Sequence, residues 1–285
     1  MINHWTTAWN EKIIPLARRQ RILLACDFDG TVAPIAATPH DAKLPENTHA
    51  LLRKLSSCEG ITLAFVSGRE LADLKSKVNL EGVTYCGNHG MEIETPDLYW
   101  ENSEALSYRP NLSSAIDQLK RQSADMEGVL IEDKRFTASV HWRLASPDDR
   151  EQLRASVRDV LKLHPDLRLT YGKAVWEIRP PVASNKGTAL SFLLRKTELA
   201  AVDAVFLGDD HTDESAFQAL EEGFTIRVGT VSDTKARFRA ENVADAAGLL
   251  FCLYVARNGE PAEYATTPFP EMFSEAELAS PRSGF

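Results

Sequence analysis

Two carboxylates, Asp27 and Asp29, lie two residues apart and directly follow an apolar run at 22–26. An aspartate can attack a phosphorus atom as a nucleophile. A second aspartate nearby can protonate the leaving oxygen and later take a proton from water. Gly30 allows the sharp turn that such a site needs. A strand ending in an ordinary Asx turn has the same residues, so other motifs must decide between the two interpretations.

Two later residues have the chemistry of phosphate binding. Ser67 follows the apolar run 61–66, and its hydroxyl and the neighbouring N–H groups can bind a phosphoryl oxygen. Lys186 opens a predicted helix, where the helix dipole disfavours a cation unless a phosphate or the charge of Asp27 compensates it. The alternatives are an ordinary strand–helix cap at Ser67 and a surface lysine at position 186.

An acidic cluster follows the apolar run 204–207. It consists of Asp209, Asp210, Asp213 and Glu214. Unpaired carboxylates repel one another, and Mg²⁺ relieves this repulsion because it takes oxygen ligands and bridges to phosphate. Asp213 and Glu214 also fit an acid-rich helix N-terminus. That alternative explains Asp209 and Asp210 less well.

The elements around these motifs alternate between buried strands and helices. We predict strands at 21–26, 61–66, 83–86, 204–207 and 224–228 and helices at 45–57, 186–196, 213–220 and 245–256. This order is typical of an α/β fold with a doubly wound, Rossmann-like parallel sheet. The catalytic groups would then meet at the carboxyl ends of the strands.

The middle of the chain has a different pattern. We predict helices at 104–123 and 147–162 and strands at 128–134, 136–143, 167–171 and 174–178. This is an inserted α+β cap domain at 104–180, and residues 1–103 and 181–285 form a discontinuous core. The first twenty residues have a loose helical period. The tail from Gly259 is rich in Pro, Ser and Glu, which predicts a partly extended or disordered segment.

Composition excludes several function classes. The 285 residues carry a formal net charge of −9 and no long basic run, so nucleic-acid binding is not expected. No apolar run is long enough for a membrane helix, and the N-terminus lacks a signal-peptide pattern. Cys26 and Cys86 end strand-like runs, which predicts buried thiols. We therefore expect a cytoplasmic protein that binds no membrane.

The order of Asp27-Phe28-Asp29-Gly30-Thr31, Ser67, Lys186 and the acidic cluster resembles the haloacid dehalogenase superfamily of phosphotransferases. The resemblance implies that Asp27 is the nucleophile and Asp29 the general acid and base. It implies phosphate binding by Ser67 and Lys186. The implied Mg²⁺ ligands are Asp27, the backbone carbonyl of Asp29 and Asp209, with Asp210 or Asp213 holding a metal-bound water.

Polar motifs in and beside the insert narrow the resemblance from the superfamily to one family within it. The motifs are NHGME at 88–92, EDK at 132–134, HWR at 141–143, GKAVWEIRP at 172–180, NKG at 185–187 and GDDHTDE at 208–214. Singly, each fits a solvated strand end or a salt bridge. Together they are similar to trehalose-6-phosphate phosphatases. The implied substrate-binding residues are Arg69, Asn88, His89, Glu132, Lys134, His141, Arg143, Lys173 and Glu177.

The resemblance implies a Mg²⁺-dependent phosphatase of trehalose 6-phosphate, with a functional link to a trehalose-phosphate synthase. One alternative is a phosphatase of another glycosyl phosphate, such as a mannosyl- or glucosyl-phosphoglycerate or a glucosylglycerol phosphate. Another is a non-catalytic sugar-phosphate sensor or regulatory partner of the synthase. A sensor is expected to have lost a nucleophile or a metal ligand, and Asp27, Asp29, Lys186 and Asp209 are all present. A phosphomutase is a weaker alternative than a phosphatase of another glycosyl phosphate.

Overall fold

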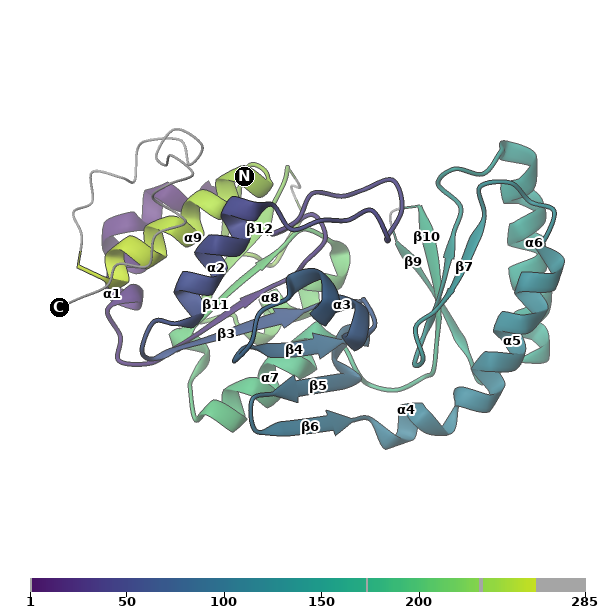
Figure 1. The fold of residues 1–285 in the computed structure, drawn as a ribbon, viewed down its shortest axis with the longest axis horizontal. Helices are drawn as coiled ribbons and strands as arrows, with labels where there is room; N and C mark the ends of the chain where they lie inside the picture. The colour runs from purple at the N-terminus through teal and green to yellow at the C-terminus, as the bar shows by residue number, and fades with distance from the viewer. Residues whose placement is uncertain (1, 173, 231–232, 260–285) are drawn as a thin grey trace.

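A nine-stranded sheet forms the larger part of the molecule (Figure 1). The computed structural model describes residues 2–172, 174–230 and 233–259. The strands, in spatial order, are β1 (Asn3–His4), β13 (Phe238–Ala240), β12 (Phe224–Val228), β11 (Ala204–Gly208), β2 (Ile22–Cys26), β3 (Ile61–Val66), β4 (Thr84–Gly87), β5 (Glu92–Thr95) and β6 (Leu98–Glu101). β1 to β4 and β11 to β13 are parallel, whereas β5 and β6 pair antiparallel at one edge.

Helices cover both faces of this sheet because the central strands are buried on both sides. In β2, Leu24 and Cys26 pack into one apolar cluster and Leu23 and Ala25 into another. The first cluster is covered by α1 (Ile14–Ala17), α2 (Glu46–Ser56), α3 (Leu71–Val78) and α9 (Val243–Arg257). The second is covered by α7 (Lys186–Thr197) and α8 (Glu214–Ala219). This confirms the doubly wound α/β prediction.

A second, antiparallel sheet of four strands lies between β6 and α7 in the chain. Its order is β7 (Leu130–Asp133), β8 (Ala138–His141), β10 (Val175–Arg179) and β9 (Arg168–Gly172). The helices of this segment are α4 (Ser103–Ser107), α5 (Arg109–Gln122) and α6 (Pro147–Leu163). Figure 1 shows α5 and α6 on the side of the small sheet that faces away from the large sheet. Their apolar residues form one cluster with it.

Some sequence predictions differ from the observed elements. The N-terminal segment is not one helix: it begins with β1, continues through the 3-10 helix Trp5–Ala8 and a π-helical turn at Trp9–Ile13, and ends in α1. β1 lengthens the large sheet by pairing with β13. The predicted helix at 104–123 is divided into α4 and α5 at Tyr108. β5, β6 and β13 were not predicted. The tail beyond Gly259 lies outside the described residues.

The cysteines are unpaired, and Cys26, Cys86 and Cys252 are buried while Cys58 is half-buried. Burial raises the pKa of the Cys86 thiol to about 12 and raises that of Cys26 further. This confirms the expected buried thiols. Within the described residues, no helix combines the length and apolar character needed to cross a membrane.

Candidate active site

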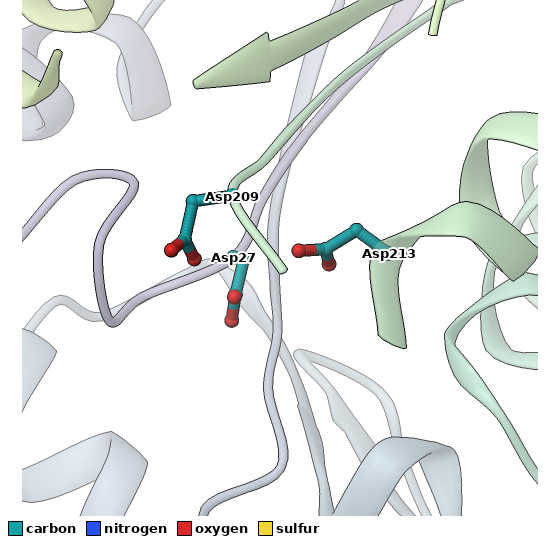
Figure 2. Close-up of side chains that lie close together, drawn as sticks. All are labelled: Asp27, Asp209 and Asp213. Carbon is teal, nitrogen blue, oxygen red and sulfur yellow. The ribbon is translucent and has the colours of Figure 1, made fainter. Parts of the chain in front are cut away.

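Three aspartates meet at the carboxyl edge of the large sheet. Asp27 follows β2, Asp209 follows β11, and Asp213 lies in the short 3-10 helix His211–Asp213. One carboxylate oxygen from each side chain lies within 4.8 Å of the others, and all three residues are buried. Figure 2 shows Asp209 and Asp213 on either side of Asp27. Because β2 and β11 are parallel neighbours, their carboxyl ends bring these residues together.

Gly30 makes room for this cluster. Its φ is +77°, and a Cβ atom built there would lie 2.4 Å from the carboxylate carbon of Asp209. No side chain fits at that distance, and residues other than glycine rarely adopt this φ. The glycine of the Asp27–Thr31 motif is therefore needed for both the turn and the approach of Asp209.

Lys186 supplies the positive charge of the site. Its Nζ lies 2.8 Å from Oδ2 of Asp27 and 2.6 Å from Oδ1 of Asp213, and the side chain is 2% exposed. The lysine is the first residue of α7, whose N-cap Asn185 accepts a hydrogen bond from the backbone N–H of Thr188. The carboxylates thus compensate the cation at this helix N-terminus, as the sequence predicted.

The charges of the cluster are not balanced. Burial lowers the pKa of Lys186, but Asp213 and Asp27 outweigh this effect and raise it. Burial raises the pKa of Asp27; Lys186 opposes this effect, whereas Asp213 and Asp209 add to it, and the pKa is raised well above its usual range. One lysine therefore does not neutralise three carboxylates at this edge.

The donor set fits a divalent cation. Three buried carboxylates offer the oxygen ligands that Mg²⁺ prefers, and a dipositive ion would offset the charge that Lys186 leaves uncompensated. The side chain of Asp210 has another role, since its Oδ1 accepts a hydrogen bond from the N–H of His211. The N–H of Asp210 donates to Oδ2 of Asp213 at 2.8 Å and so orients that carboxylate.

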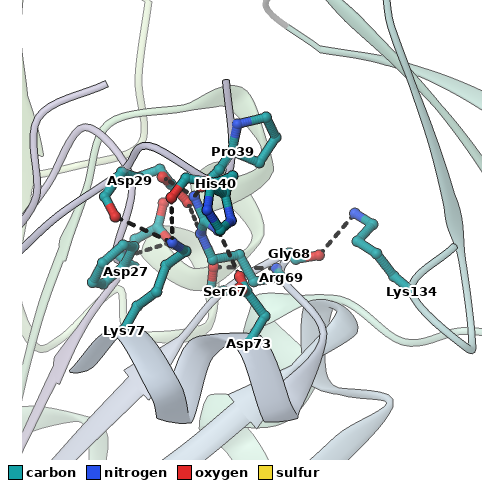
Figure 3. Close-up of polar contacts among 12 residues, drawn as sticks. Asp27, Asp29, Pro39, His40, Ser67, Gly68, Arg69, Asp73, Lys77 and Lys134 are labelled. Atoms are coloured by element: carbon teal, nitrogen blue, oxygen red, sulfur yellow. Dashed lines mark hydrogen bonds and ion pairs between the residues drawn. The ribbon is translucent and has the colours of Figure 1, made fainter. Parts of the chain in front are cut away.

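Asp29 is held by Arg69. The guanidinium donates from Nε to Oδ2 of Asp29 at 2.6 Å and from Nη2 to Oδ1 at 2.7 Å. Its third nitrogen, Nη1, donates to Asp73 at 2.6 Å, and Nη2 also reaches the carbonyl of Pro39. Figure 3 shows Arg69 between the two aspartates. Asp29 lies on the exposed side of the cluster, with 37% of its side chain accessible.

Ser67 lies beside Asp27 at the end of β3. It is buried, its N–H donates to the carbonyl of Cys86, and its hydroxyl accepts from the N–H of Arg69 at 3.3 Å. Ser67, Asp27 and Lys186 all line one cavity. Three predicted phosphate-handling residues therefore share one space at the sheet edge.

The cavity lies between the edge of the large sheet and the small sheet and has a volume of about 450 Å³. This volume is typical of a small-molecule site. Its lining includes most of the predicted substrate residues: Arg69, His89, Glu132, Lys134, His141, Arg143 and Glu177. The two sheets thus bring residues more than 100 positions apart to one space.

Glu177 forms ion pairs with two other residues that line the cavity. Its carboxylate lies 2.6 Å from Nζ of Lys134 and 3.0 Å from Nε2 of His89. Lys134 also donates to the carbonyl of Gly68 on the large-sheet side (Figure 3). Burial raises the pKa of Glu177, but Lys134 and His89 outweigh this effect and hold it well below its usual range. Burial lowers the pKa of His89, although Glu177 opposes the shift.

The other predicted substrate-binding residues lie at different places relative to the cavity. Glu132 pairs with His141 at 2.8 Å, and Arg143 donates to the carbonyl of Ala36. Asn88 is fully buried behind the cavity, where its amide donates to Glu92 and to the backbone carbonyl of Lys134. Lys173 lies outside the described residues.

Sequence reasoning missed part of the lining. The loop 35–39 forms one wall, and Tyr171 and Arg179 come from the small sheet. The Pro34 and Pro39 positions in the loop were a signal for an irregular segment near the nucleophile, but nothing in the sequence showed which way it folds. Arg135, which has a φ of +68°, joins Glu92 and Glu101 to the small sheet and was also missed.

The fold belongs to a known structural class. A solved structure of a haloacid dehalogenase-like hydrolase from Bacteroides thetaiotaomicron superposes on this chain with a TM-score of 0.59 at 14% identity, covering 81% of this chain and 98% of that one, which shows that the two share a fold.

Within that class, the chain belongs to the trehalose-phosphatase family, whose pattern matches residues 25–244. It is 32% identical over 274 residues to probable trehalose-phosphate phosphatase 2 of Oryza sativa subsp. japonica, covering 86% of this chain and 71% of the relative. It is 38% identical over 202 residues to a trehalose-phosphate phosphatase of Mycobacterium avium, covering 69% and 51% respectively. The C-terminal domain of the C. albicans trehalose-6-phosphate phosphatase has a TM-score of 0.72 at 22% identity, covering 85% of this chain and 95% of that domain.

Proposed function

We propose that this protein is a Mg²⁺-dependent phosphatase that hydrolyses trehalose 6-phosphate through an aspartyl-phosphate intermediate. The observation that carries the proposal is the placement of Asp27 beside Lys186, with Asp209 and Asp213, in a cavity whose other wall is a polar sheet surface. A phosphoryl group bound to Lys186 and Ser67 would be next to the nucleophile. Membership of the trehalose-phosphatase family supports the substrate.

The proposed first step is attack by an oxygen of Asp27 on phosphorus, in line with the ester oxygen of the sugar. The new bond joins Asp27 to phosphorus while the ester P–O bond breaks, and the leaving oxygen takes a proton from Asp29. In the second step Asp29 takes a proton from water, which attacks phosphorus. The bond to Asp27 then breaks and restores the carboxylate.

The residues that would hold Mg²⁺ are Asp27, Asp209 and Asp213, with the backbone carbonyl of Asp29 as a further proposed ligand. Asp210, whose Oδ1 accepts a hydrogen bond from the N–H of His211, would contribute through a bound water. When bound, the ion supplies positive charge next to the phosphoryl oxygens. Lys186 contributes a fixed positive charge to the same oxygens. Ser67 would orient them through its hydroxyl and the N–H groups that follow β3.

Arg69 gives Asp29 its position in this proposal. Both oxygens of Asp29 accept from the guanidinium, so the carboxyl must leave at least one of these bonds when it donates a proton to the leaving group. We propose that substrate entry opens the pair.

The sugar is proposed to lie against the small sheet. Residues 104–180 would form the cap domain and residues 1–103 and 181–285 the core. The proposed sugar contacts are Glu132, Lys134, His141, Arg143, Lys173 and Glu177 from the cap and Arg69 and His89 from the core. Asn88, predicted as a further contact, lies behind the cavity and would act by positioning the backbone at Lys134. Carboxylates such as Glu132 can accept hydrogen bonds from the many hydroxyls of a disaccharide. A functional link to a trehalose-phosphate synthase is part of the proposal, because that enzyme makes the substrate.

The test is phosphate release from a panel of esters, measured with Mg²⁺ and with EDTA. The panel holds trehalose 6-phosphate, glucose 6-phosphate, mannosyl-3-phosphoglycerate, glucosylglycerol phosphate and p-nitrophenyl phosphate. A strong Mg²⁺-dependent preference for trehalose 6-phosphate supports the proposal. A preference for another glycosyl phosphate keeps the role of Asp27 and contradicts the sugar assignment. No release from any ester favours a sugar-phosphate sensor.

A further inference from the structure

The small sheet has one apolar face and one polar face. Ile131, Val140 and Trp176 lie side by side on β7, β8 and β10 and pack with α5 and α6. Successive side chains of a strand point to opposite faces, so the residues between them point away from these helices. Figure 1 shows that this second face is turned toward the large sheet, and its residues line the active-site cavity.

Four polar side chains form a row across this second face. Backbone pairing places Ser139 of β8 between Glu132 of β7 and Glu177 of β10. It also places Thr170 of β9 next to Glu177. We call these four residues the polar row, and all of them line the active-site cavity. Neighbouring strands are about 4.8 Å apart, so the polar row is about 14 Å long.

Ser139 differs from the other members of the polar row. Glu132 and Glu177 form ion pairs, and the hydroxyl of Thr170 donates to the carbonyl of Glu177 at 3.4 Å. Ser139 is only 4% exposed, yet no group of the described residues makes a hydrogen bond with its hydroxyl. Buried hydroxyls are normally paired, so this hydroxyl must pair with the molecule that fills the cavity, either water or a ligand.

We propose that the sugar of the substrate lies across the strands along the polar row, and that Ser139 is a specificity-determining residue whose hydroxyl binds it. The inference rests on the proposed phosphatase function and adds how the site selects a disaccharide. A pyranose ring is about as wide as one strand spacing, so the four strands accommodate two rings. Sugar hydroxyls both donate and accept hydrogen bonds, which suits a row of carboxylates and hydroxyls.

The small side chain of Ser139 also leaves room for the sugar. The loop 35–39, which belongs to the large-sheet part, lines the same cavity with apolar groups, including Ile35, which is 48% exposed. Arg143 donates to the carbonyl of Ala36 at 3.1 Å and so joins this loop to the segment after β8. Sugars carry apolar C–H groups as well as hydroxyls, so a space with polar and apolar walls can contact both. A larger side chain at position 139 would narrow this space.

Steady-state kinetics of the full-length protein test the role of Ser139. Ser139→Ala removes the hydroxyl and should lower kcat/KM for trehalose 6-phosphate about fivefold, mainly through KM, which is the scale of one neutral hydrogen bond. Ser139→Val fills the space and should lower kcat/KM roughly 10²-fold, the effect of extra carbon atoms in a tight pocket. Neither variant should change the hydrolysis of p-nitrophenyl phosphate, which carries no sugar. Ser156→Val, the same substitution on α6, is the matched control and should behave as wild type with both esters.

The two ends of the polar row test the orientation of the sugar. Glu132 and Thr170 lie on the outermost strands of the small sheet, so only a sugar with two rings reaches both. Glu132→Ala and Thr170→Val should each lower kcat/KM for trehalose 6-phosphate, whereas no more than one of them should lower it for glucose 6-phosphate. An effect of only one variant, or of neither, on trehalose 6-phosphate overturns the orientation across the strands.

Binding of trehalose itself, measured by calorimetry, separates this inference from the proposed function. A wild-type protein that binds trehalose without hydrolysing its phosphate contradicts the function, and loss of that binding in Ser139→Val would still support the inference. Normal hydrolysis of trehalose 6-phosphate with unchanged kcat/KM in both Ser139 variants leaves the function intact and overturns the inference. An equal loss with p-nitrophenyl phosphate, or a wild-type protein that prefers a one-ring ester or neither hydrolyses trehalose 6-phosphate nor binds trehalose, overturns it as well. Ser139→Ala decides the outcome if Ser139→Val fails to fold.

Discussion

Nζ of Lys186 lies 2.8 Å from Oδ2 of Asp27, and both side chains are more than 90% buried. The lysine also holds Asp213 at 2.6 Å, so one cation connects the end of β2 to the loop after β11. The pair fixes the position of one oxygen of Asp27, and the other oxygen, Oδ1, accepts a hydrogen bond from the N–H of Phe28 at 2.7 Å. The proposed nucleophile and the proposed phosphate-binding charge are thus positioned by the same contact.

Replacing Asp27 with Asn should abolish turnover while the protein stays folded. An amide of the same shape cannot form the aspartyl-phosphate, and loss of a nucleophile typically lowers kcat by roughly 10⁴-fold or more. The measurement is phosphate release with Mg²⁺, together with a thermal melt. Asp159→Asn, on the exposed side of α6, is the matched control and should keep full activity. Normal turnover by Asp27→Asn would contradict the mechanism.

Replacing Lys186 with Met should destabilise the protein most strongly when Mg²⁺ is absent. Removing one partner of a buried ion pair costs about 3 kcal/mol, because the remaining charges are left uncompensated. A metal ion at the same carboxylates would restore part of that charge, and a ligand that binds only the folded state raises its stability. Thermal melts in EDTA and in Mg²⁺ should therefore differ more for Lys186→Met than for wild type.

Lys120→Met, a substitution of an exposed lysine on α5, controls for the loss of a lysine and should respond to Mg²⁺ as wild type does. An equal response of Lys186→Met and wild type to the ion would mean that Mg²⁺ does not bind at these aspartates.

The fold was predictable where hydrophobic patterns are long. The runs that became β2, β3 and β11 are largely buried on both faces, and each is directly followed by a polar residue that lines the cavity: Asp27, Ser67 and Asp209. β5 and β6 were missed because their alternation is short and polar: β6 keeps Leu98, Tyr99 and Trp100 partly exposed. The N-terminal segment has a helical spacing of apolar residues, but pairing of Asn3 and His4 with β13 is a long-range contact that no local pattern encodes.

The site was predictable in its charged groups and not in their pairing. Asp27, Lys186 and Asp209 come from strand ends and a helix start, which the sequence marks clearly. The bond from Arg69 to Asp29 depends on where the loop after β2 lies relative to the end of β3, and the sequence analysis, which assigned Arg69 to substrate binding, did not predict it. Asn88 has the composition of a ligand-binding residue, yet its three hydrogen bonds to Glu92, Lys134 and Thr137 lie behind the cavity.

Replacing Arg69 with Lys should lower kcat by roughly 10²-fold with a smaller change in KM, since misplacing a catalytic group by about 1 Å has that effect. A lysine cannot donate to both oxygens of Asp29 as the guanidinium does. Steady-state kinetics with the preferred ester separate the two parameters, and Arg53→Lys on α2 is the control. A rise in KM at constant kcat would instead favour substrate binding as the main role of Arg69.

Stability should fall on acidification partly through Glu177. Lys134 and His89 hold its pKa well below the usual range, so between the folded and unfolded pKa values the unfolded chain binds more protons. Its contribution is therefore complete above the unfolded value of about 4.3 and is lost as pH falls through the folded value. Glu177→Gln should cost about 3 kcal/mol near neutral pH, and the difference from wild type should shrink below pH of about 4.

Urea unfolding at a series of pH values measures this difference. Glu151→Gln, an exposed change on α6, should give a constant difference from wild type across the series. A constant difference for Glu177→Gln as well would contradict the assignment of the acid transition to this carboxylate.

Replacing Gly30 with Ala should weaken both the fold and the proposed metal site, and Gly82→Ala separates the two causes. Both glycines have positive φ, +77° and +72°, so alanine costs about 1–2 kcal/mol at each position. At Gly82 no heavy atom of the described residues, apart from the glycine and its two chain neighbours, lies within 4 Å of the added Cβ, whereas at Gly30 the Cβ would lie 2.4 Å from the Asp209 carboxylate. The free energy of unfolding of Gly30→Ala should therefore be about 2 kcal/mol lower than that of Gly82→Ala because of this overlap.

Since Asp209 must move, Gly30→Ala should also need more Mg²⁺ for half-maximal phosphate release, and Gly82→Ala should not. Equal unfolding free energies for the two variants, with the same Mg²⁺ requirement, would mean that Asp209 is not confined by Gly30.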